Sequence, residues 1–211
     1  MKLPAPLILA SASPQRRRLL RRLGVPFTVM ASRARENVHD PDPSRLVVKL
    51  ALRKALAVAR ARPHAWVLGA DTVVWCRGRY CLKPRGRADS LRMLSWLNGR
   101  WQEVHTGVAL VAAGGKSRWT TAVKTRVLAR RLGAARLAEF AGRHLDKAGG
   151  YAVQDRRDPF IRRVVGDRSN VVGLPVAAVR RLLRRALAPA PPPRAARKRT
   201  GPLSARRPRR R

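Results

Sequence analysis

The sequence predicts an α/β protein, and three observations support that fold class. Short apolar runs typical of buried strands alternate along the chain with longer segments whose apolar residues recur at helical spacing. The length of 211 residues suits one medium domain. No run of about 18 apolar residues occurs, so we expect a cytoplasmic protein without a membrane contact.

The first third of the chain begins with the apolar run at 7–10, which is typical of a short buried strand. Ser13 and Pro14 then form a helix start, with an N-cap residue followed by proline at the first helical position. This helix should end at Gly24. Further elements follow, a strand near 27–30, a helix at 44–61 and a strand at 66–70 that should end on Asp71.

The rest of the chain continues the alternation and then changes composition. We expect helices at 88–97, 134–142 and 176–186 and strands at 104–111 and 120–128. After Ala188 the sequence is rich in proline, arginine and alanine and has almost no residue that could build a core. We therefore expect one folded domain at 1–188 and a disordered basic tail at 189–211.

The net charge is extreme, because 48 Lys and Arg face only 11 Asp and Glu, a formal +37. The tail contributes nine of these cations and no acid, which leaves 39 against 11 in the body, a net +28. Such a surface attracts polyanions, and nucleotides, nucleic acid, polyphosphate and anionic membrane all qualify. Codon usage that favours arginine would give the same composition without any functional partner.

The two cysteines, Cys76 and Cys81, lie five residues apart with no second pair and only His105 nearby. Neither a zinc site nor a disulfide framework has this spacing. We expect buried or partly buried thiols in a reducing compartment.

Two segments have residues suited to chemistry on phosphates. In SASPQRR, at 11–17, a strand runs into a helix, so backbone amides, the helix dipole and Arg16 converge in a way that suits a phosphate. In GADTVV, Asp71 follows an apolar strand, where a carboxylate can hold a divalent cation or orient a water. Taken singly, each has a structural alternative, an ordinary basic helix start and a turn-capping aspartate.

Together with later blocks, these segments resemble the Maf family of nucleoside triphosphate pyrophosphatases. The blocks in order are LASASPQRR, GADTVV, the KP pair at Lys83 and Pro84, EVHTGVAL, DKAGGYAVQ and SNVVGLP. The resemblance implies a Maf/ITPase-like two-lobed α/β fold with an elongated mixed sheet and a central cleft. It also implies hydrolysis of a nucleoside triphosphate to the monophosphate and pyrophosphate, a Mg²⁺ or Mn²⁺ cofactor and a homodimer.

The resemblance assigns roles to individual positions. Asp71 matches the proton acceptor of the family and, with Glu36, its metal-binding acids. The positions that match substrate- and phosphate-binding residues are Ser13, Gln15, Arg16, Lys54, Thr72, Lys83 and Gln154. Thr72 and Gln154 correspond to base-selecting positions, and the GADTVV form is similar to the branch that prefers dTTP and UTP.

The chain departs from the family pattern at several positions around the expected cleft. Gln15 replaces the first arginine of the SPRR signature, and loss of a charged partner typically costs about 1.5 to 3 kcal/mol. Arg18, Arg35 and Leu82 also differ, as does the run at 155–158. These changes leave an alternative open, a weakly active or inactive Maf-derived protein that uses its charge and tail for sequence-independent contact with nucleic acid or another polyanion.

Overall fold

The computed structural model describes residues 3–155 and 158–188, and a mixed seven-stranded sheet runs through it. The strands are β1 (Leu7–Leu9), β2 (Phe27–Val29), β3 (Trp66–Cys76), β4 (Arg79–Cys81), β5 (Trp101–Val111), β6 (Arg118–Ala129) and β7 (Ile161–Val165). Their order is β2-β1-β3-β5-β6-β7, with β4 paired to β3. The three strands β2, β1 and β3 are parallel and the remaining pairs are antiparallel, which confirms the expected mixed sheet.

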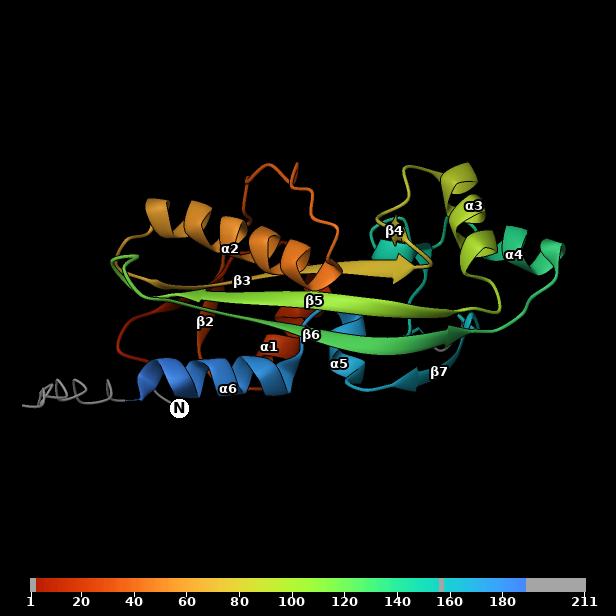
Figure 1. Cartoon of the computed structure of the whole chain (residues 1–211). Coiled ribbons are helices and arrows are strands. Elements are labelled where there is room, and N and C mark those ends of the chain that lie inside the picture. Colours follow the sequence, from red (N-terminus) through yellow and green to blue (C-terminus); the bar gives the residue numbers. More distant parts are fainter. Residues whose placement is uncertain (1–2, 156–157, 189–211) are drawn as a thin grey trace, which may run out of the picture.

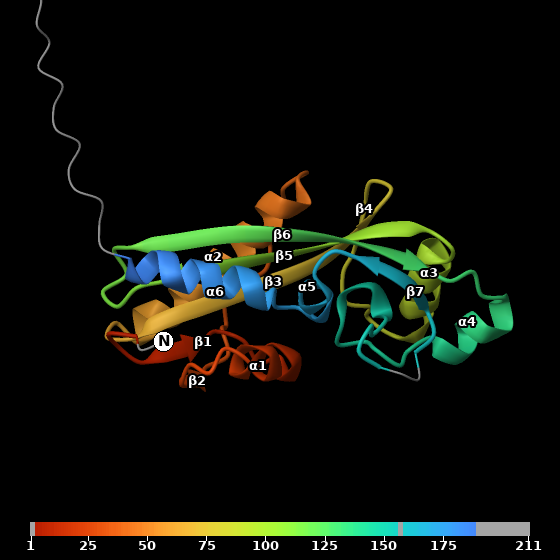
Figure 2. The ribbon, with the colours of Figure 1, turned by 90° about the horizontal axis from the view of Figure 1, so that it is seen from below.

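Helices cover both faces of this sheet. They are α1 (Pro14–Arg21), α2 (Pro43–Ala61), α3 (Arg87–Leu97), α4 (Ala134–Phe140), α5 (Arg168–Val172) and α6 (Val176–Leu187), with a short 3-10 turn, η1, at Ala148–Gly150. Helix α2 lies on one face and α1, α5 and α6 lie on the other, while α3, α4 and β4 gather at the far end of the long strands (Figure 1). The view from below shows β3, β5 and β6 running the length of the molecule between these groups (Figure 2).

Separate groups of buried side chains lie at the two ends of the long strands. One surrounds Leu20, Leu68 and Leu183, from α1, β3 and α6. The other surrounds Leu94 and Phe160 and includes residues of α3, β4 and α4. These two clusters, connected by shared strands, correspond to the two lobes that the resemblance implies.

Helix α2 packs its apolar side chains against the sheet, and two glycines of the sheet lie directly beneath its backbone. A Cβ atom at Gly69 of β3 would lie 2.2 Å from the carbonyl oxygen of Ala51, and one at Gly107 of β5 would lie 2.2 Å from that of Val47. Backbone atoms of a helix cannot move aside as the end of a flexible side chain can. The two glycines therefore fix how closely α2 approaches the sheet, which matters because α2 carries Lys54.

The structure corrects one sequence prediction that bears on the site. The strand expected to end on Asp71 continues to Cys76, because β3 pairs with β5 from Val67 through Trp75. The residues that follow Asp71 are mostly β-branched or aromatic, which favours continued extension. Asp71 therefore lies within a long strand instead of capping one.

Other expectations have simple outcomes. Cys76 and Cys81 are buried, free thiols, as predicted. In the described part of the chain, no helix combines the length and apolar character needed to cross a membrane. The tail at 189–211 lies outside the described residues.

Candidate active site

A pocket lies at an open edge of β3. Strand β1 pairs with β3 only as far as Leu68, and β4 begins to pair at Val74. Between these points, the edge of β3 has no partner strand on that side among the described residues. Side chains from both faces of the strand can therefore reach the same hollow, and Asp71 and its neighbour Thr72 both line it.

All nine residues that the sequence singled out line this one pocket. They are Ser13, Gln15, Arg16, Glu36, Lys54, Asp71, Thr72, Lys83 and Gln154. They come from α1, the loop before α2, α2, β3, the segment after β4 and the segment after η1. The geometry brings the candidate residues together, and their individual chemical roles stay predictions.

The N-terminus of α1 forms one wall of the pocket. The Ser13 hydroxyl accepts a hydrogen bond from the backbone N–H of Arg16 at 3.4 Å, and Pro14 occupies the start of the helix, as predicted. A second hollow adjoins the first and is lined by the turn at 10–14 together with Glu36, Lys54 and Lys83. Backbone amides at a helix start and two lysines give this region the features of an anion-binding site.

Two carboxylates meet on a single lysine in the pocket. The Lys54 ammonium lies 2.5 Å from Oδ1 of Asp71 and 2.6 Å from Oε1 of Glu36. Lys54 and Asp71 are mostly buried, with side chains 13% and 10% exposed, whereas Glu36 is 62% exposed. Burial of a charged group is costly unless an opposite charge pairs with it, so Lys54 and Asp71 depend on each other.

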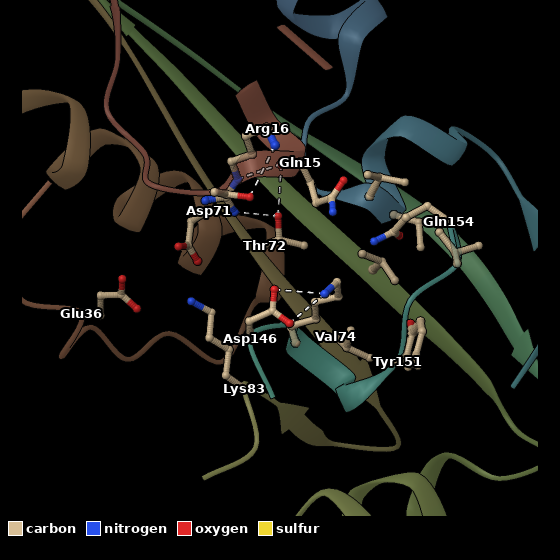
Figure 3. A pocket seen from close by; sticks show the side chains of 18 of the residues that line it. Gln15, Arg16, Glu36, Asp71, Thr72, Val74, Lys83, Asp146, Tyr151 and Gln154 are labelled. Atoms are coloured by element: carbon tan, nitrogen blue, oxygen red, sulfur yellow. Dashed lines mark hydrogen bonds and ion pairs between the residues drawn. The ribbon is translucent and has the colours of Figure 1, made fainter. Parts of the chain in front are cut away.

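The charges around Glu36 keep it ionised. Burial acts to raise the pKa of Glu36, but the hydrogen bond and charge of Lys54 and the charges of Lys83 and Arg16 outweigh it, so the pKa lies below its ordinary value. Lys83 is exposed and forms no ion pair or hydrogen bond with another residue of the described chain. The Lys83 ammonium points into the pocket and lies between the carboxylates of Glu36 and Asp146 (Figure 3).

Arg16 is held by the protein on several sides. Its Nε donates to the carbonyl oxygen of Gly173 at 3.0 Å, Nη1 to the Ser11 hydroxyl at 3.4 Å and Nη2 to the Thr72 hydroxyl at 3.1 Å. Burial lowers the pKa of the guanidinium, against the charges of Asp71 and Glu36. Arg16 therefore ties α1, β3 and the turn after α5 together at the pocket wall, and it keeps further N–H groups for a ligand.

The floor of the pocket continues this hydrogen-bond chain. The hydroxyls of Thr72 and Thr106 lie 3.0 Å apart, and the Thr106 hydroxyl donates to the carbonyl oxygen of Asn170 at 3.1 Å. The fully buried Asn170 amide in turn donates to the Val104 carbonyl oxygen and the Thr125 hydroxyl. The SNVVGLP block thus holds α5 against β5 and β6 and so shapes the pocket.

The opposite end of the pocket is apolar, with an amide on each side. Five valines line the pocket: Val74 of β3, Val104 of β5, Val153 in the segment after η1, and Val171 and Val172 of α5. The side chains of Gln15 and Gln154 lie on this side of the pocket, across from Glu36 and Asp71 (Figure 3). The site is therefore divided into a charged end and an apolar end that carries hydrogen-bonding amides.

Some lining residues were not among the candidates. Asp146 and Lys147 form an ion pair at 2.7 Å at the pocket, and Tyr151 lies nearby with its hydroxyl buried and without a hydrogen-bond partner. All three belong to the DKAGGYAVQ block, so the motif pointed to the segment but not to these side chains. The valines carried no such signal, because an apolar residue in a strand ordinarily indicates a core position.

The acidic residues of the pocket can be compared with the ligands that a divalent cation requires. The described residues contain no group of three or more His, Cys, Asp or Glu that could hold a metal by themselves. Glu36 and Asp71 nevertheless direct oxygens at one cation, the Lys54 ammonium. Mg²⁺ is commonly bound by one or two carboxylates together with substrate phosphates and water, so these two acids fit a metal that arrives with a phosphorylated ligand.

The residues that depart from the family pattern differ in whether they line the pocket. Gln15 lines the pocket, whereas Arg18 is exposed on α1 and lines a separate hollow beside Gln154. Leu82 is 54% exposed and its carbonyl oxygen accepts from Gly149, while the Arg35 carbonyl oxygen accepts from Arg53. Residues 156 and 157 of the run at 155–158 lie outside the described residues. Among the departures that the structure describes, only Gln15 lines the pocket.

The fold and site define an α/β protein with a pocket at a sheet edge, in which two acids share one lysine. Comparison with protein families gives the relationship. The chain matches the family model described as Maf-like protein over residues 6–186, and it belongs to the Maf family.

Curated relatives align over most of their own length. A dTTP/UTP pyrophosphatase from Elusimicrobium minutum is 42% identical over 178 residues, which cover 84% of this chain and 97% of the relative. Those from Moorella thermoacetica and Myxococcus xanthus are 47% and 43% identical, and the alignments cover 93% and 94% of their lengths and 84% and 88% of this chain. The similarity therefore spans the folded body and not an isolated motif.

Proposed function

We propose that this chain hydrolyses a nucleoside triphosphate to the nucleoside monophosphate and pyrophosphate, with dTTP, UTP or modified pyrimidine nucleotides as substrates. The observation that carries the proposal is the division of the pocket. One end gathers Glu36, Lys54, Asp71 and Lys83, and Gln15, Gln154 and Val74 lie on the other side (Figure 3). Four further valines line the same pocket. Relatives named dTTP/UTP pyrophosphatase support the same assignment.

The two ends of the pocket favour one orientation of a bound nucleotide. Its base would lie against the valines, where the amides of Gln15 and Gln154 offer donors and acceptors to the base edge. Its triphosphate would extend past Lys54 and Lys83 into the adjoining hollow beside the turn at 10–14. Positive charge there stabilises the leaving pyrophosphate as its negative charge develops.

The reaction is attack of water on the α-phosphorus, with cleavage of the bond to the bridging oxygen between the α- and β-phosphates. Asp71 would accept the proton of the attacking water, and the Lys54 ammonium, 2.5 Å from its Oδ1, would orient the carboxylate. A divalent cation held by Glu36 and Asp71 would supply Lewis acidity and charge neutralisation at the phosphates. Mg²⁺ and Mn²⁺ both suit such oxygen ligands.

The test is pyrophosphate release from a panel of nucleotides, with Mg²⁺ and with Mn²⁺. The panel comprises dTTP, UTP, CTP, the 5-methyl forms of UTP and CTP, pseudouridine triphosphate and 7-methylguanosine triphosphate. We expect selective turnover of pyrimidine triphosphates and a loss of roughly a hundredfold to ten-thousandfold in Asp71→Asn, the usual contribution of a positioned base. A matched control is Asp89→Asn, which changes an acid on α3 outside the pocket. Wild-type turnover no higher than that of Asp71→Asn would reject the proposal.

Three further expectations belong to the same proposal, the homodimer from the resemblance and the location and tail contact from composition and charge. A homodimer would appear in sedimentation velocity as a species of twice the 23.5 kDa chain mass. A cytoplasmic enzyme would be found in the cytosolic fraction of its cells. The tail at 189–211 would add sequence-independent nucleic-acid contact, and a chain cut after Ala188 would lose that part of the affinity.

A further inference from the structure

The same hexapeptide, RRLLRR, occurs twice in the chain. It occupies 17–22 in α1 and its C-cap and 180–185 in α6. In both copies the leucine pair is buried and the two arginine pairs are exposed. The pattern follows from helical periodicity, since residues one, two, five and six of the hexapeptide share the face opposite to residues three and four.

The fold brings the two copies to one side of the molecule. Leu19 and Leu20 of α1 belong to the same buried cluster as Leu182 and Leu183 of α6. Both helices lie on the face of the sheet opposite to α2 (Figures 1 and 2). Eight arginines from segments about 160 residues apart in sequence thus cover one side of the body; we call this the arginine face.

Acidic residues are absent from the segments that build the arginine face. All 11 acids of the sequence lie between Glu36 and Asp167, so the first 35 and the last 44 residues contain none. Among the described residues, none of the eight arginines forms an ion pair within 4.0 Å. Some arginines elsewhere in the described chain do form ion pairs, as Arg45 does with Asp42, Arg92 with Asp89 and Arg143 with Glu139.

We propose that the arginine face binds the phosphate backbone of duplex nucleic acid without reading its sequence. Eight unpaired guanidiniums suit a regular array of phosphates, because each can donate two parallel hydrogen bonds to phosphate oxygens. Neither hexapeptide contains an aromatic residue on which an unpaired base could stack, which favours a duplex over a single strand. The leucines of both helices are buried in the core and cannot insert into a lipid bilayer, which argues against a membrane surface.

This inference goes beyond nucleotide hydrolysis and does not depend on it. None of the eight arginines lines the pocket at the edge of β3, although Arg18 and Arg22 line a neighbouring hollow together with Gln154. The tail at 189–211 follows α6 directly in sequence and adds nine cations. Every variant compared below therefore keeps the tail, so that the tail contributes equally to each measurement.

The experiment measures binding of the full chain to a fluorescein-labelled 30-base-pair DNA duplex of arbitrary sequence by anisotropy, without nucleotide, over a range of salt concentrations. One variant replaces the four arginines of α6, Arg180, Arg181, Arg184 and Arg185, by glutamine. The matched control removes the same charge from paired arginines of other elements, Arg45, Arg92, Arg136 and Arg143, also as glutamine. Circular dichroism and pyrophosphate release establish that each variant is folded.

We expect the α6 variant to bind more weakly and to lose about 2 to 4 from the magnitude of its log–log salt slope, since each phosphate contact contributes about 0.9. The control should lose less than about 1. Equal losses in the two variants would overturn the proposal, because net charge alone would then explain binding. Binding to phosphatidylglycerol vesicles that exceeds binding to the duplex would overturn it as well.

Discussion

Replacing Lys54 by methionine should destabilise the folded protein by about 3 kcal/mol. Lys54→Met keeps most of the side-chain volume but leaves the Asp71 carboxylate, only 10% exposed, without its ion-pair partner. Removal of one partner of a buried pair typically costs about 3 to 5 kcal/mol, because the remaining charge stays desolvated. Arg16 lies near enough to interact with Asp71, which places the expected cost at the lower end of that range.

The two acids that share Lys54 should contribute unequally to this loss. Glu36 is 62% exposed, and ion pairs of exposed groups contribute about 0 to 1 kcal/mol. Glu36→Gln should therefore cost less than about 1 kcal/mol. Asp71→Asn introduced into Lys54→Met should recover most of the loss, because the uncompensated charge has been removed.

Urea unfolding followed by fluorescence of the five tryptophans measures these free energies. The single variants and the double variant form a double-mutant cycle for Lys54 and Asp71, and Lys124→Met serves as the control. Lys124 is 53% exposed and pairs with Glu103, which is itself 33% exposed. A loss below about 1 kcal/mol in Lys54→Met, or no recovery in the double variant, would refute the view that Asp71 depends on Lys54.

Three further variants or reactions test the surrounding structure. Gly107→Ala should destabilise the protein by about 1 to 3 kcal/mol or more, since its Cβ would clash with the α2 backbone, and a normal urea midpoint would contradict this. Asn170→Leu should cost about 1 to 3 kcal/mol by removing the buried hydrogen bonds to the Val104 carbonyl and the Thr125 hydroxyl, measured in the same way. Burial raises the pKa of the Cys81 thiol to about 11, so iodoacetamide at pH 8.5 should label Cys81 slowly in the native state and quickly in urea. Because this pKa is raised by folding, the contribution of the Cys81 thiol to stability is fully present below the pKa of the unfolded thiol and is lost as pH rises toward 11. Equal labelling rates in the native state and in urea would argue against the raised pKa and against this pH dependence.

The sequence predicted the fold class and most element positions because their signals are local. Ser13 and Pro14 marked the start of α1, and apolar spacing marked α2 and α6. Helix α5 was missed because five residues are too few for helical periodicity to be recognised. The extension of β3 was missed because its pairing with β5 is a tertiary interaction that no local pattern reports.

Local patterns singled out Arg16 and Asp71, but the site as a whole was predictable only through the resemblance. No spacing rule relates Glu36 to Lys54 or Lys54 to Asp71, since these residues meet through the packing of α2 on β3. The glycines that permit this close packing look like breaks in a strand when they are read from sequence. The arginine face had no signal as a surface either, because its two hexapeptides are adjacent only after folding.

The most direct test of the proposed reaction identifies the bond that is cleaved. Hydrolysis of dTTP in ¹⁸O-labelled water, with the products resolved by mass spectrometry, reports which phosphorus the water attacks. Attack at the α-phosphorus predicts thymidine monophosphate carrying the label and unlabelled pyrophosphate in equal amounts. Thymidine diphosphate with labelled orthophosphate would contradict the proposal, because the pocket would then direct water to the γ-phosphorus.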